Sequence, residues 1–111
     1  MRDRVPSGFL KVARVAEIPE KRGKRIIAGD EEIALWRVDG RIYAINNICS
    51  HQHLSALHQG TLDGMHVICP MHGWSYDLES GEAREGSGRV RTYQVRVEEG
   101  DIYILLKVDE A

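Results

Sequence analysis

The sequence has few of the features on which several classes of protein depend. Its 111 residues include one Phe, two Cys and three Pro. Two cysteines are too few for a disulfide-dense scaffold. No run of about 18 apolar residues is present, so no transmembrane helix is expected. Arg2, Asp3 and Arg4 stand near the start with no apolar stretch after them. We therefore expect no signal peptide, no membrane partner and a cytoplasmic location.

The chain also lacks a strong excess of charge. Fifteen Lys and Arg oppose seventeen Asp and Glu, for a net charge of −2, so nucleic acid is not an expected partner. Up to Arg25, however, eight Lys or Arg face only three Asp or Glu. This basic segment is either a solvated face or a surface that steers a partner. The length suits a single domain spanning 1–111, with its core at about 9–106.

Long amphipathic helices are missing too, and short strands separated by turns take their place. Asp39-Gly40 is a two-residue hairpin signal because both positions tolerate positive φ, and Glu99-Gly100 predicts another turn. One helical turn is predicted, over 54–58. The pattern indicates an all-β sandwich or small barrel. The predicted strands cover residues 9–15, 25–28, 32–38, 41–46, 65–69, 74–78, 90–97 and 101–108.

Charge is nearly absent from the middle of the chain. The 35 residues from Ile42 to Tyr76 contain one formally charged side chain, Asp63. The same window holds both cysteines and all five histidines. Either two loops and a buried strand happen to be uncharged, or the window forms a site that docks closely to a partner. We favour the second interpretation.

Two motifs in this window pair a cysteine with a histidine. Cys49-Ser50-His51 and Cys69-Pro70-Met71-His72 each follow a predicted strand, so each lies on a loop. Together they offer two thiolates and two imidazoles, which suit the two irons of a 2Fe–2S cluster. Two ferric ions, two sulfides and two thiolates sum to zero charge. Such a centre accepts an electron more readily than an all-Cys one, at about −150 to +300 mV.

A structural zinc site is the alternative reading of the same ligands. Zinc binds two Cys and two His readily, but its usual spacing groups Cys with Cys and His with His. Here each motif holds one of each. The mixed spacing favours iron–sulfur, and the zinc-stabilised, non-redox interaction module stays open as an alternative of another class.

The two motifs, continued by Gly73-Trp74-Ser75-Tyr76-Asp77 and Gly81, resemble the Rieske iron–sulfur domain. The resemblance implies small stacked antiparallel sheets with two cluster-binding loops at one tip. It implies that Cys49 and Cys69 bind the inner iron of one 2Fe–2S cluster, while His51 and His72 bind the exposed outer iron. The surrounding residues that it implies are Leu54, Met71, Trp74 and Tyr76.

Departures from the high-potential branch of this family narrow the expected role. That branch has an extra cysteine in each loop, joined as a disulfide, where this chain has Leu54 and Met71. It also has a serine where this chain has Trp74, whereas Tyr76 matches its tyrosine. The potential should therefore lie in the low part of the Rieske range. Backbone N–H groups near His53, Leu54, Met71 and Trp74 are expected to donate to cluster sulfurs.

The segment from His72 to Asp77 is also similar to the Rieske part of ring-hydroxylating oxygenases, but 111 residues leave no room for their catalytic iron domain. We therefore expect no enzyme but a soluble one-electron carrier, a ferredoxin that takes electrons from a flavoprotein reductase and passes them to a terminal oxygenase. The alternative is the small subunit of an NAD(P)H-dependent nitrite reductase. Leu54, Pro70 and Met71 would form the docking contact.

Overall fold

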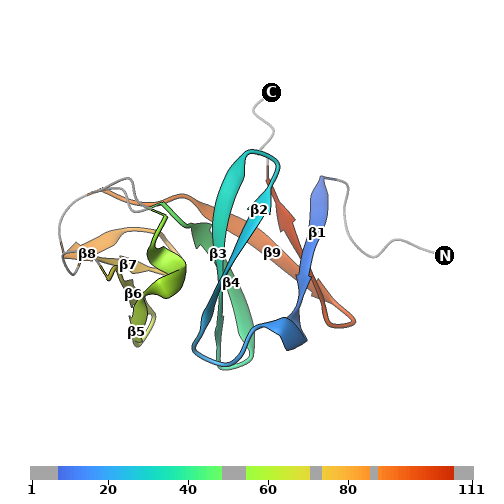
Figure 1. Ribbon diagram of the computed structural model, residues 1–111, viewed down its shortest axis with the longest axis horizontal. Coiled ribbons are helices and arrows are strands. Elements are labelled where there is room, and N and C mark those ends of the chain that lie inside the picture. The colour runs from blue at the N-terminus through green and yellow to red at the C-terminus, as the bar shows by residue number, and fades with distance from the viewer. Residues whose placement is uncertain (1–7, 49–54, 71–73, 86–87, 107–111) are drawn as a thin grey trace.

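The computed structural model describes residues 8–48, 55–70, 74–85 and 88–106. Regular structure in these ranges is almost entirely β (Figure 1), which confirms the predicted fold class. The elements in chain order are β1 (Phe9–Arg14), the 3₁₀ turn η1 (Val15–Glu17), β2 (Gly23–Ala28), β3 (Glu31–Val38), β4 (Arg41–Asn46), the 3₁₀ turn η2 (Leu57–Gln59), β5 (Thr61–Asp63), β6 (His66–Ile68), β7 (Ser75–Asp77), β8 (Ala83–Glu85), β9 (Thr92–Glu98) and β10 (Asp101–Leu105).

Two antiparallel sheets make up the fold. The larger sheet has the strand order β1-β10-β9-β4-β3-β2, and its two outer strands, β1 and β2, contact each other. The sheet therefore curls around its own core. The smaller sheet has the order β5-β6-β7-β8 and lies beside β3, on the side of the molecule away from β1 (Figure 1).

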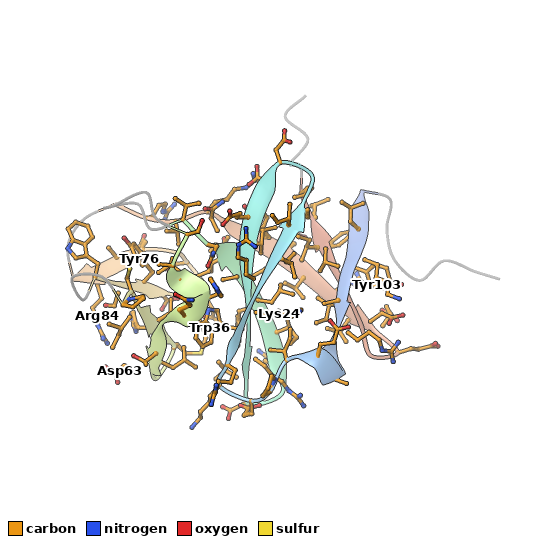
Figure 2. All side chains as sticks on the ribbon, viewed as in Figure 1. Lys24, Trp36, Asp63, Tyr76, Arg84 and Tyr103 are labelled. Carbon is orange, nitrogen blue, oxygen red and sulfur yellow. The ribbon has the colours of Figure 1, made fainter. Side chains whose placement is uncertain are left out.

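Strand β3 is buried on both of its faces. Ile33 and Leu35 belong to the core inside the curled sheet. Ala34 and Trp36 point the other way and belong to a second core, shared with the small sheet. Period-two alternation places successive side chains on opposite faces, so one strand serves both cores. The labelled Trp36 lies between the two sheets in Figure 2.

Both predicted turns are confirmed. Asp39 and Gly40 have φ of 54° and 78°, and Glu99 and Gly100 have φ of 54° and 82°. The backbone N–H groups of Asp39 and Gly40 both donate to the carboxylate of Glu20, the second at 3.1 Å. These bonds hold the β3–β4 hairpin at the end opposite the predicted metal site.

Two short strands, β5 and β8, were not predicted. Each has three residues, too few to show an alternating pattern, and β8 is largely polar in sequence. Both become strands because they pair with β6 and β7. The predicted helical turn at 54–58 is η2, shifted toward Gln59. In the part of the chain just outlined, no helix is long and apolar enough to cross a membrane.

Candidate metal centre

Cys69 follows β6 directly and is buried, with 1% of its surface exposed. Its backbone N–H donates to the carbonyl of Trp74 at 2.7 Å. This bond joins the end of β6 to the start of β7, so residues 70–73 form the connection between the two strands. Pro70, the next residue, is exposed. A buried thiol next to an exposed proline suits a metal ligand close to the protein surface.

The first motif is also held at both ends. Ile48 pairs with Ser55 in an antiparallel bridge, and residues 49–54 connect them. The predicted ligands Cys49, His51 and His72 lie outside the described residues, as do Leu54 and Met71. Their ligand and supporting roles therefore remain predictions. Within the described ranges, no cluster of three His, Cys, Asp or Glu side chains forms a metal site.

The ends of the two connections meet in one core. Ala56 and Leu57 follow the first connection, and they share the second core with Val67, Cys69 and Tyr76 around the second. The β6–β7 pairing places Tyr76 opposite Val67, and Tyr76 is fully buried. Trp74 packs against the same core and is half-buried. The fold thus places Cys69 and Tyr76 in one core, with Trp74 packed against it.

The donor chemistry fits a cluster with two thiolate and two imidazole ligands. Cys69 is a buried cysteine, and a thiolate in such a place is stabilised by a cation such as an iron ion. Asp63, the single charged side chain in the central window, is well exposed and lies 3.1 Å from the guanidinium of Arg84. Figure 2 shows both labelled residues at the outer side of the small sheet. The neutral surroundings of Cys69 suit a centre whose own charge is close to zero.

Two histidines of the window have other partners. His66 Nε2 lies 3.7 Å from the carboxylate of Asp77, on the same outer face as Arg84. His58 Nδ1 lies 3.2 Å from Asn47 Oδ1, and its backbone N–H donates to the same oxygen at 2.6 Å. Burial, and after it the positive charge of Arg25, lower the pKa of His58. Both histidines therefore contact residues of the fold around the site.

Sequence reasoning missed a polar network beside the first motif. The carboxylate of Glu32 accepts hydrogen bonds from Arg25, Ser55 and Asn47, with Arg25 contributing most to lowering the pKa of Glu32, to about 2. On the other side, burial and the hydrogen bond to Glu31 raise the pKa of Tyr93 to about 12. The consecutive asparagines 46 and 47 were the available signal, because polar amides at a strand end are seldom buried without partners.

Ferredoxin subunits of dioxygenase systems are among the known proteins that this chain resembles. A ferredoxin subunit of the 3-phenylpropionate/cinnamic acid dioxygenase of Escherichia coli K12 is 40% identical over 92 residues, which cover 81% of this chain and 86% of the relative. A solved complex of reduced oxygenase and oxidized ferredoxin in carbazole 1,9a-dioxygenase contains a chain that is 28% identical, with a TM-score of 0.81, covering 94% of this chain and 100% of that one.

A nitrite reductase small subunit shares the fold alone. The NADH-dependent nitrite reductase small subunit of Mycobacterium tuberculosis aligns with a TM-score of 0.84 at 20% identity, over 91% of this chain and 96% of its own. The family model described as Rieske [2Fe-2S] domain matches residues 8–102. The chain therefore belongs to the Rieske 2Fe–2S domain family.

Proposed function

We propose that this protein is a ferredoxin that carries single electrons from a reductase to the terminal oxygenase of a ring-hydroxylating dioxygenase system. The observation that carries the proposal is the pair of Cys/His motifs in a chain that matches most of the length of a dioxygenase ferredoxin subunit. The solved ferredoxin–oxygenase complex supports the same kind of partner. The protein is then a component of an oxidoreductase system and not itself the enzyme.

Four residues would hold the cluster that the family implies. Cys49 and Cys69 would bind one iron, and His51 and His72 would bind the other. When bound, the cluster supplies a site that gains and loses one electron at constant ligation. The burial of Cys69 supports this assignment, because a thiolate ligand shielded from water is protected from oxidation and from competing protons.

Residues around Cys69 have supporting roles. Trp74 fixes the end of the second connection through its carbonyl, which accepts the N–H of Cys69. Tyr76 is fully buried in the same core, where it keeps water from the thiolate side of the site. In the family pattern, the hydroxyl of the tyrosine at the Tyr76 position approaches a ligand cysteine. A hydrogen bond there would raise the reduction potential of the cluster slightly.

Partners would dock where the histidine ligands reach the surface. Pro70 is exposed and next to buried Cys69, so a partner at this point comes close to the metal site without entering the protein. Leu54 and Met71 would extend the same uncharged contact. A small apolar contact suits a complex that forms and separates at every electron transfer.

The first experiment tests the cluster itself. The protein is purified anaerobically, its iron, sulfide and zinc are measured, and the dithionite-reduced form is examined by EPR. We expect two irons and two sulfides per chain with a Rieske signal, and both are lost in Cys69→Ser. His66→Asn, which alters a histidine paired with Asp77 on the outer face, is the matched control and keeps the cluster. A colourless, zinc-loaded protein would overturn the proposal.

The second experiment tests the electron-transfer role. The protein replaces the ferredoxin subunit in a reconstituted 3-phenylpropionate dioxygenase system, and substrate-dependent NADH oxidation is followed. We expect oxygenase turnover that needs this chain and stops with Cys69→Ser. A stable complex with a large reductase subunit, and no support of any oxygenase, would instead indicate the nitrite reductase role.

A further inference from the structure

Two consecutive asparagines stand where β4 leads into the first motif. Asn46 is the last residue of β4 and pairs with Ile33 of β3. Asn47 comes next, is fully buried, and donates its backbone N–H to the carbonyl of Glu32 at 2.9 Å. Cys49 lies two residues further on. Whatever fixes these asparagines therefore also fixes the start of the segment that carries Cys49 and His51.

Asn47 joins both ends of that segment to β3. Its carbonyl accepts the N–H groups of Ala56 and Leu57, each at 3.2 Å, and its Oδ1 accepts the N–H of His58 at 2.6 Å. Its Nδ2 reaches Oε1 of Glu32 at 3.5 Å. The residues that follow 49–54 are thus tied to one buried residue, Asn47, through both its backbone carbonyl and its side chain.

Glu32 strengthens this tie from the other direction. Its Oε1 accepts the hydroxyl of Ser55 at 2.6 Å, and Ser55 is the residue that closes the bridge with Ile48. Its Oε2 pairs with Arg25 of β2 at 3.2 Å. The guanidinium of Arg25 keeps the Glu32 carboxylate charged. Its oxygens therefore remain acceptors for Ser55 and Asn47.

Asn46 makes a second, separate connection. Its Oδ1 accepts the N–H of Ile48 at 2.9 Å, and its Nδ2 donates to the hydroxyl of Tyr93 at 3.1 Å. That hydroxyl donates to Glu31 at 2.6 Å, and Glu31 also pairs with Arg91 at 3.3 Å. Neighbouring residues of a strand send their side chains to opposite faces. Glu31 and Glu32 therefore anchor the two asparagines from the two faces of the β3–β4 pair.

We propose that Asn46 and Asn47, anchored by Glu31 and Glu32, are positioning residues that hold the first motif in register with the second. The inference rests on the proposed ligands Cys49 and His51. Two loops that share one cluster must keep a constant separation while its charge changes, because a loose loop lets ligands exchange with water. The double anchor supplies that rigidity without adding a charge within the central window.

The test compares Asn47→Ala and Asn46→Ala with the control Glu20→Ala. Glu20 also accepts two backbone N–H groups, but at the opposite end of the β3–β4 hairpin. For each holoprotein, cluster loss to a chelator is timed well below the unfolding temperature, the reduced EPR line width is recorded, and hydrogen exchange is followed over 44–58. We expect about tenfold faster cluster loss, broadened lines and about tenfold faster exchange in the asparagine variants only.

Two results would overturn the proposed role of the asparagines. Equal cluster loss in Glu20→Ala and Asn47→Ala, at equal thermal stability, would overturn the proposal because the effect would then be general destabilisation. Unchanged exchange over 44–58 in both asparagine variants would overturn it as well. Should Asn47→Ala fail to fold, Glu32→Gln replaces it, and faster cluster loss than in Glu20→Gln is required. A wild-type protein that binds no Rieske cluster would refute the proposed function. Hydrogen exchange over 44–58 would still show whether the two asparagines hold this segment in place.

Discussion

Gly81 and Gly40 have the same positive φ of 78° but different surroundings. A Cβ atom added at Gly81 would lie 2.0 Å from the carbonyl oxygen of Val90, whereas one at Gly40 would meet nothing within 4 Å. The Gly81 N–H donates to Asp77, and its carbonyl accepts the N–H of Val90, both at 2.8 Å. Gly81 therefore sets how β7 and β8 meet the chain that leads into β9.

The two glycines give a matched pair of variants. We expect Gly40→Ala to lose about 1 kcal/mol of unfolding free energy, the cost of a side chain at positive φ. Gly81→Ala should lose about 3 kcal/mol or more, because the backbone must also move away from Val90. Urea unfolding of both holoproteins measures the difference. Equal losses would show that the backbone can move Val90 away from the new Cβ atom at no cost in stability, contrary to the prediction.

The raised pKa of Tyr93 predicts that the folded state loses stability at high pH. Its pKa is raised to about 12 from an ordinary value of 10, so the folded state holds the phenolic proton more tightly than the unfolded state. The resulting stabilisation is complete below pH 10 and is lost as the pH rises from 10 through 12. In ultraviolet titration of the folded protein, we expect Tyr93→Phe to remove a tyrosinate step near pH 12. Loss of a step near pH 10 instead would contradict this assignment.

At the scale of elements, β3 couples the curled sheet to the small sheet. Leu35 and Trp36 are neighbours in sequence and almost fully buried, but they belong to different cores. A change at Trp36 acts on the core that contains Cys69, while a change at Leu35 acts on the other core. One strand thus offers a test of which core supports the metal site.

We expect Trp36→Phe and Leu35→Val each to lower the unfolding free energy by about 1 kcal/mol through lost packing. Cluster loss and hydrogen exchange of Val67 and Tyr76 should accelerate only in Trp36→Phe, because only Trp36 packs with those residues. If cluster loss accelerates equally in both variants, in line with their stability, then the core around Trp36 has no special role in supporting the metal site.

Across the whole molecule, ion pairs neutralise part of the excess positive charge of residues 1–25. Lys11 and Arg14 lie 3.5 and 2.8 Å from the carboxylate of Asp101, and Arg25 pairs with Glu32. In Figure 1, β1 lies across the curled sheet from β5–β8. Asp101 therefore offsets about half of the positive charge of Lys11 and Arg14, and both residues lie on the opposite side of the molecule from the small sheet.

Steering of a partner by Lys11 and Arg14 should consequently be weak. We expect the double variant Lys11→Gln/Arg14→Gln to keep the rate of electron transfer to the oxygenase within about twofold at both low and high salt, since exposed charges act over about 10 Å. Stopped-flow mixing at several ionic strengths measures this. A large, salt-dependent drop in rate would restore the steering hypothesis.

Local chemistry explains how much could be predicted beforehand. The strand β4 and the two turns with positive φ depend on residues close in sequence, and they could be predicted for that reason. The strands β5 and β8 depend on partners in β6 and β7, so their three residues carry no signal of their own. The network through Glu31, Glu32, Asn46 and Asn47 was missed because its bonds cross between strands.

The predicted metal chemistry rests on local sequence alone: two Cys/His motifs in an uncharged window, at a spacing that suits two irons. Residue type sets which metals can be bound, and that information is local. The folded chain adds three facts: β3 serves two cores, Cys69 is buried, and the residues on both sides of 49–54 are tied to the buried Asn47 or are that residue. Burial and hydrogen bonding depend on residues far apart in the chain, so folding alone brings them together.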